Sequence, residues 1–167
     1  MYIEFLFLII DYFSTIDRRI FIYEWLIPIA IGIVSLFFSI STEVVDLYGF
    51  TNGVIGFISV LLGFTLAALT LFLTGNTHIE RTKQYITDKT IRGKKISLHR
   101  LLVVNYSYLI VIESILCICF YIGNLFSFLC STTLALGLNS IFIILFFNIL
   151  LTTIRTITDL YFIISKE

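Results

Sequence analysis

Four long apolar segments alternate with short polar ones along the chain, and this alternation predicts the fold. The apolar segments cover residues 20–41, 54–73, 98–126 and 134–157. A helix needs about 20 apolar residues to cross the hydrocarbon core of a bilayer, and each segment reaches that length. We therefore expect an all-α integral membrane protein, a four-helix bundle in which residues 1–167 form a single transmembrane domain.

The residues before the first span predict a further, shorter helix. Residues 2–16 are mostly apolar but too few to cross a bilayer. Glu4, Asp11 and Thr15 fall on one helical face, so the helix is amphipathic. We expect it to lie in the cytoplasmic interface. Its polar face is acidic, whereas such anchors are usually basic, and packing against the bundle is the alternative.

Composition supports a lipid environment. The chain is 59% hydrophobic and 13% charged, and its mean hydropathy is +1.04. Soluble domains carry about 25% charged residues. A soluble protein of this length could not bury so much apolar surface, so we expect lipid to be its solvent and a multi-pass location in a cell inner membrane.

The basic residues are clustered, and their clustering predicts the topology. Seven of the eleven Lys and Arg residues lie in the stretch Thr74–Arg100, which joins the second span to the start of the third: Arg81, Lys83, Lys89, Arg92, Lys94, Lys95 and Arg100. The two outer connections, 42–53 and 126–133, have none. Because basic segments stay on the cytoplasmic side, the loop 75–97 and both termini are predicted to be cytoplasmic.

Small residues and one proline predict how the first two spans pack. Gly32 and Ser35 in the first span, and Ser59, Gly63 and Ala67 in the second, form stripes that allow close helix packing. The second span should be the most tightly packed of the four. Pro28 lacks a backbone N–H and should leave a carbonyl of the first span without its helical donor.

Polar side chains inside the spans are the candidates for function. Glu113 lies about 20 Å along the third helix from Arg100, near the middle of the bilayer. We predict a polar seam or gate between helices or subunits, made by Glu113, Tyr106, Asn124, Asn148 and Thr152. The alternative is a protonated Glu113 that only fixes helix register. Glu24, near the interface, is expected to pair with Arg18 or Arg19.

The sequence offers no catalytic chemistry. It has no phosphate-binding glycine loop, no metal motif of His and Glu, and no nucleophile elbow. The spacing of Cys117 and Cys119 does not suit a tetrahedral metal site. We therefore expect no enzyme activity, no cofactor and no metal. The basic loop is expected to contact lipid headgroups or a soluble cytoplasmic partner protein, without direct binding of nucleic acid.

Three stretches of the chain resemble a known class of proteins. They are the run from Gly63 to Thr74 with its following basic loop, the segment Asp17–Pro28, and Leu98-His-Arg-Leu-Leu. Together they resemble small multi-spanning membrane proteins of bacterial antiphage defence, found in retron, Kiwa, cyclic-nucleotide and CRISPR-associated systems. The likeness covers the first three spans and carries over no catalytic residues.

The resemblance implies an inner-membrane effector that permeabilises the membrane, or a sensor tied to a soluble partner. Four helices cannot easily enclose a pore alone, so we expect a homo-oligomer. Two alternatives stay open. The chain could be a small oligomeric ion channel or transporter subunit without a role in defence. It could also be a non-catalytic membrane anchor that recruits a soluble enzyme through the segment 81–100.

Overall fold

The computed structural model describes residues 2–42, 47–74, 77–125 and 132–164. The elements follow in the order α1 Tyr2–Thr15, α2 Arg18–Phe21, a π-helical turn Ile22–Leu26, α3 Ile27–Thr42, α4 Leu47–Thr74, α5 Thr77–Gln84, β1 Ile86–Ile91, β2 Lys94–Ser97, α6 Leu98–Leu125 and α7 Thr132–Ile164. Most of the described chain is therefore helical, as the apolar pattern predicts.

Four of the described helical segments are long and apolar enough to cross a membrane. They are Arg18–Phe38, Gly53–Thr74, Leu98–Ile122 and Leu136–Tyr161. These segments overlap the four predicted spans, so the described helices agree with a multi-pass membrane protein by their length and composition. The first of them combines α2, the π-helical turn and most of α3.

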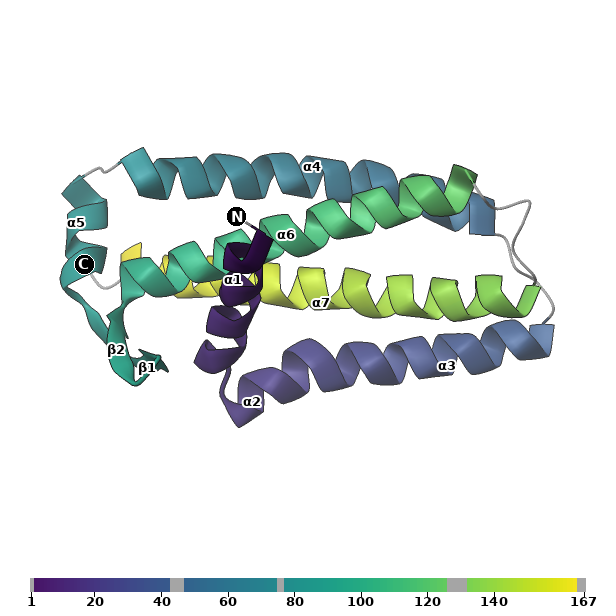
Figure 1. Ribbon diagram of the computed structural model, residues 1–167, viewed down its shortest axis with the longest axis horizontal. Helices are drawn as coiled ribbons and strands as arrows, with labels where there is room; N and C mark the ends of the chain where they lie inside the picture. Colours follow the sequence, from purple (N-terminus) through teal and green to yellow (C-terminus); the bar gives the residue numbers. More distant parts are fainter. Residues whose placement is uncertain (1, 43–46, 75–76, 126–131, 165–167) are drawn as a thin grey trace.

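The four long helices run side by side, with α6 and α7 as the two inner ones (Figure 1). The main pairings are α4 with α6, α6 with α7, and α7 with α3. In the most apolar part of α6, 56% of the residues are buried, whereas the corresponding share in α4 is 11%. The prediction that the second span packs most tightly is therefore wrong within this chain. The reason is that α6 is covered by helices on two sides, whereas α4 packs mainly on α6.

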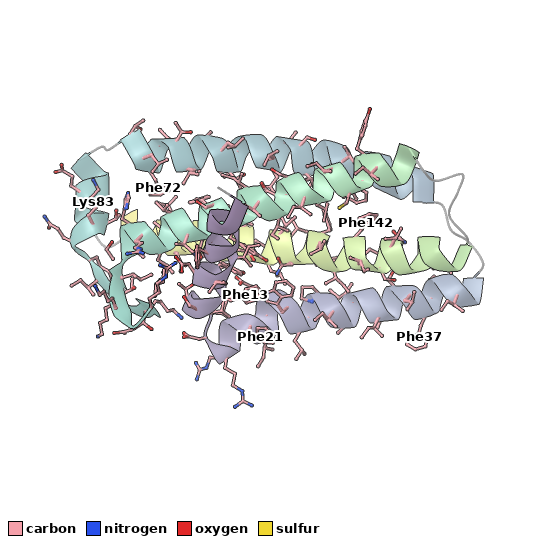
Figure 2. The ribbon with its side chains drawn as sticks, viewed as in Figure 1. Phe13, Phe21, Phe37, Phe72, Lys83 and Phe142 are labelled. Atoms are coloured by element: carbon pink, nitrogen blue, oxygen red, sulfur yellow. The ribbon has the colours of Figure 1, made fainter. Side chains whose placement is uncertain are left out.

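Most of the described basic residues lie at one end of the long helices, on α5, the two strands, the start of α6 and the end of α7 (Figure 1). Arg18 and Arg19 lie on α2, at the start of the first span. Along the long helices, large apolar side chains such as Phe21 and Phe37 point outward from the protein (Figure 2). This separation of charge from apolar surface agrees with a membrane protein; the cytoplasmic placement of the basic end remains a prediction from the charge pattern.

Within the predicted loop 75–97, the described residues 77–97 include helix α5 and two strands. The strands β1 and β2 form an antiparallel hairpin in which Ile91 pairs with Lys94. The two turn residues between them, Arg92 and Gly93, have φ of 51° and 76°. Positive φ at both positions is typical of a type I′ hairpin turn. Ile91 and Ile96 pack with Leu101 and so attach the hairpin to α6.

Helix α1 does not stand apart from the long helices. It crosses α6 in Figure 1 and packs against both α6 and β1. Tyr12 and Thr15 are buried, whereas Phe7, Ile10 and Phe13 are exposed. The alternative interpretation, packing against the bundle, therefore applies to this helix. Its exposed apolar side chains are also compatible with contact to lipid at the interface.

Candidate functional site

A buried ion pair joins the start of the first span to the end of the last. The Arg155 Nε atom lies 2.8 Å from Glu24 Oε1, and the Glu24 side chain is only 3% exposed. The expected pairing of Glu24 with Arg18 or Arg19 is therefore wrong. Both of those arginines are exposed, whereas the π-helical turn carries Glu24 on the side that faces α7.

Tyr12 of α1 covers this ion pair. Its hydroxyl donates a hydrogen bond of 2.7 Å to Glu24 Oε2 and lies 3.3 Å from Thr152 Oγ1. Its ring stacks on Tyr108 of α6 with 3.5 Å between the ring centroids. Burial, followed by the neighbouring Tyr108 and Glu24, raises the pKa of Tyr12 above its ordinary value, so the hydroxyl keeps its proton and remains a donor.

Amide and phenol side chains complete the cluster. The Tyr108 hydroxyl donates to Asn148 Oδ1 at 2.9 Å, and Arg155 Nη2 donates to Asn105 Oδ1 at 3.4 Å. We call Glu24, Arg155, Tyr12, Tyr108, Asn148, Asn105 and Thr152 the Glu24 cluster. Its side chains come from α1, the π-helical turn, α6 and α7. Movement of one of these elements would therefore break hydrogen bonds to the others.

Pro28 explains why the backbone at Glu24 takes part in the cluster. A proline cannot donate to the carbonyl four residues earlier, which here is that of Glu24. The chain forms a π-helical turn over Ile22–Leu26, a feature often found at functional sites. The freed Glu24 carbonyl instead accepts a hydrogen bond of 2.7 Å from Asn148 Nδ2. The predicted loss of a helical donor is thus confirmed, and Asn148 replaces it.

A double-mutant cycle can test whether Asn148 supplies the hydrogen bond that Pro28 cannot donate to the Glu24 carbonyl. Asn148→Leu should lower the free energy of unfolding by about 1–3 kcal/mol, because it leaves the buried Glu24 carbonyl without a donor. In a Pro28→Ala background the backbone N–H of residue 28 can serve that carbonyl, so the same substitution should cost about 1 kcal/mol less. Unfolding of the detergent-solubilised protein measures both costs; strictly additive values would contradict this role of Asn148.

A second buried carboxyl lies between α4 and α6. Glu113 is fully buried, and Thr65 of α4 lies 2.7 Å from its Oε2 atom. On the same face of α6, His99 Nε2 lies 3.1 Å from the Phe72 carbonyl oxygen. The Tyr106 ring lies 5.6 Å from the Phe72 ring. His99, Tyr106 and Glu113 therefore lie on the face of α6 that packs on α4.

The predicted polar seam is divided between two places. Glu113 and Tyr106 face α4, whereas Asn148 and Thr152 belong to the Glu24 cluster. The side chain of Asn124 lies outside the described part of the structure. The described helices therefore do not form one seam from Glu113, Tyr106, Asn148 and Thr152. The reason is that Glu113 of α6 faces α4, whereas Tyr108 of α6 faces α1 and α7.

The residues predicted for helix packing differ in how far they are buried. A side chain at Gly32 would overlap Ile144 and lie 3.2 Å from the Ser140 carbonyl oxygen, so glycine permits the close contact of α3 with α7. Ser35 is half-buried. In α4, Ser59, Gly63 and Ala67 are exposed at the surface of the single chain. A packing role for these three remains a prediction that requires a second chain.

Two of the predicted basic contact residues pair with α1 or with the connection that follows it. Lys89 forms an ion pair with Asp17, the N-cap of α2. Arg92 Nε lies 3.6 Å from Asp11 Oδ1, with its guanidinium 5.0 Å from the Phe7 ring. Lys95 pairs with Asp88 inside the hairpin. Lys83, Lys94 and Arg100 are exposed, Lys83 at the end of the protein in Figure 2; the side chain of Arg81 lies outside the described residues.

Tyr12, Asn105 and Tyr108 are the cluster members that sequence reasoning did not single out. Tyr12 and Thr15 lie three apart on a short helix, and this spacing was the available signal for a buried face. Among the described residues, no group of three or more His, Cys, Asp and Glu side chains could hold a metal ion.

Comparisons with known protein families, with curated proteins and with solved structures find no match to this chain.

Proposed function

We propose that this chain is an inner-membrane component of a prokaryotic antiphage defence system. In this proposal it acts as an oligomeric effector or sensor that a soluble partner controls through the basic hairpin. The defence role rests on the resemblance of the first three spans. The observation that carries the mechanism is that α1 contacts the hairpin on one side and the buried Glu24–Arg155 pair on the other.

The contacts of α1 on its two sides differ in strength, which suits a switch. Toward the hairpin, Asp11 of α1 pairs with Arg92, and Asp17, at the N-cap of α2, pairs with Lys89. Exposed pairs of this kind contribute about 0–1 kcal/mol each, so a competing partner can break them. Toward the membrane helices, Tyr12 is buried and bonded to Glu24. A rigid helix joining both sets of contacts transmits a shift of the hairpin to the cluster.

A partner changes the state of the protein only by binding one state more tightly than the other. A partner that binds the hairpin better when the hairpin is detached from α1 would favour withdrawal of Tyr12. Glu24 and Arg155 would then lose their cover within the predicted first and last spans. Charged groups exposed at that depth draw in water, and several copies side by side would perturb the bilayer. This is the proposed effector state.

The second candidate is a small oligomeric ion channel or transporter subunit. The buried Glu113 favours it, because ionisable side chains within membrane spans often mark ion or proton paths. Ion flux through the purified protein in liposomes, without any partner, would support this candidate over a partner-controlled effector.

The third candidate, a membrane anchor that recruits a soluble enzyme, makes a different prediction. Neutralising Lys94 and Lys95 would release the enzyme from membranes and leave membrane potential unchanged during infection.

The ion pair of Asp17, which follows α1, with Lys89 of the hairpin provides the direct test of the proposed control by a partner. Asp17→Lys should abolish phage protection, because it repels Lys89, while lowering the free energy of unfolding by no more than about 1 kcal/mol. The exchange Asp17→Lys with Lys89→Asp should restore protection. Plaque counts and membrane potential would be recorded in cells that express the chain together with its neighbouring genes.

The matched control is Asp88→Lys, which breaks the pair with Lys95 inside the hairpin and leaves α1 untouched. This variant should protect as well as the unaltered chain. Equal loss of protection in Asp17→Lys and Asp88→Lys would contradict a specific role for the contact of α1 with the hairpin. Absence of any protection by the unaltered chain would contradict the defence role itself.

A further inference from the structure

Two oxygen atoms, the Leu62 carbonyl oxygen and Glu113 Oε2, lie within hydrogen-bond distance of the single Thr65 hydroxyl. Thr65 Oγ1 lies 3.0 Å from the Leu62 carbonyl oxygen and 2.7 Å from Glu113 Oε2. A threonine hydroxyl has a single proton to donate and two lone pairs to accept with. If Thr65 donates to Leu62, its oxygen is left facing Glu113 Oε2 as an acceptor, and the short contact needs a proton from Glu113.

The surroundings of the second carboxyl oxygen, Glu113 Oε1, also indicate a protonated Glu113. Glu113 Oε1 is buried and has no hydrogen-bond partner among the described residues. A carboxylate would spread its negative charge over this bare oxygen, which is costly in a buried, apolar environment. In a carboxylic acid, Oε1 is an uncharged carbonyl oxygen, which is far less expensive to leave unpaired.

Among the side chains that the structure describes, no cation is placed to neutralise Glu113. The segment Gly53–Thr74 of α4 contains no ionisable residue. On α6 the ionisable neighbours along the chain are Tyr106, Tyr108, Cys117 and Cys119, all neutral in their ordinary form. From α1 comes Tyr12, which is bonded to Glu24. On α7, Arg155 is paired with Glu24, and Asp159 lies one turn further on.

We propose that Glu113 and Thr65 form a proton-binding site between α4 and α6. The bound ligand is a proton on Glu113 Oε2, donated to Thr65 Oγ1, while the Thr65 hydroxyl donates to the Leu62 carbonyl. Every polar hydrogen then has an acceptor. The site does not depend on the proposed defence function, and it belongs to a different helix pair from the Glu24 cluster.

This site couples proton release to the packing of α4. Loss of the proton would leave a negative charge between α4 and α6, so release requires water or a cation to enter between the two helices. Helix α4 packs mainly on α6, so movement of α4 away from α6 would open this site without displacing another pair of long helices. Separation of α4 from α6 and discharge of the proton are therefore expected to occur together.

Infrared spectroscopy of the full chain in liposomes tests the protonation directly. We expect a C=O stretching band of a protonated carboxyl group at neutral pH, which shifts in D2O. Glu113→Gln should remove this band, and Glu24→Gln should leave it, because Glu24 is paired with Arg155. Thr65→Val should shift the band to higher frequency by removing its hydrogen-bond acceptor, and Thr65→Ser should restore its position.

Dicyclohexylcarbodiimide provides a chemical test on the same samples. This apolar reagent takes the proton of a buried carboxylic acid onto its nitrogen and bonds the carboxyl oxygen to its central carbon; the acyl group then migrates to nitrogen as a stable adduct. We expect mass spectrometry to locate an adduct on Glu113 and none on Glu24. Absence of both the band and the adduct would overturn the proposal. Protection from the reagent by millimolar Na⁺ would overturn it in favour of a metal-cation site.

Discussion

Replacing Arg155 by alanine is expected to lower the free energy of unfolding by about 3–5 kcal/mol, because it leaves a buried carboxylate without its counter-charge. The Glu24 side chain is 3% exposed and has only one ion-pair partner in the described structure. Its remaining hydrogen bond, from Tyr12, does not neutralise a full negative charge. The loss can be measured by denaturant unfolding of the purified protein in detergent or bicelles.

Two further variants separate the charge effect from lost packing. Arg155→Met combined with Glu24→Gln removes both charges, so it should cost less than the sum of the two single substitutions. Arg18→Ala is the matched control, since Arg18 is an exposed arginine, and it should change stability by no more than about 0.5 kcal/mol. If Arg155→Ala cost as little as this control, the buried ion pair would not stabilise the fold.

Tyr12→Ala is expected to release α1 from the long helices. Truncating a large buried aromatic side chain typically costs about 3–5 kcal/mol, and Tyr12 is fully buried, stacked on Tyr108 and bonded to Glu24. Hydrogen exchange should therefore accelerate throughout Tyr2–Thr15, whereas the amides of α6 should stay protected. Tyr12→Phe keeps the stacked ring and should cost only about 1.5–3 kcal/mol, through the lost hydrogen bond to a charged group.

Phe13→Ala is the control for the Tyr12 prediction. Phe13 is adjacent in sequence and similar in size, but it is 41% exposed. Its truncation should leave the exchange of α1 amides close to that of the unaltered chain. Faster exchange of α1 in Phe13→Ala than in Tyr12→Ala would show that contacts of the exposed face, and not Tyr12, hold the helix in place.

Much of the architecture follows from patterns that are local in sequence. An apolar run of about 20 residues can only be accommodated as a membrane helix or a buried core helix, so the four spans were predictable to within a few residues. The effect of Pro28 was also predictable, because a missing N–H is a covalent property of proline. The shared face of His99, Tyr106 and Glu113 follows from the helical period alone.

The hairpin was not predicted, although its signals are in the sequence. Ile86–Ile91 contains β-branched residues at four of its six positions, and Arg92-Gly93 can form a two-residue turn. Many charged residues in the same stretch made a loop the simpler expectation. The strands are stabilised by packing of Ile91 and Ile96 on Leu101, a contact that a reading of the polar stretch by itself does not include.

The amino-acid sequence alone determined the number of spans, the clustering of charge and the position of the proline-induced break, because each depends on residues that are close together in the chain. Only the tertiary structure decided that Glu24 pairs with Arg155, that Tyr12 covers this pair, and that Glu113 faces Thr65. These partners lie far apart in sequence, and helical periodicity specifies which residues share a face but not which neighbouring helix that face meets.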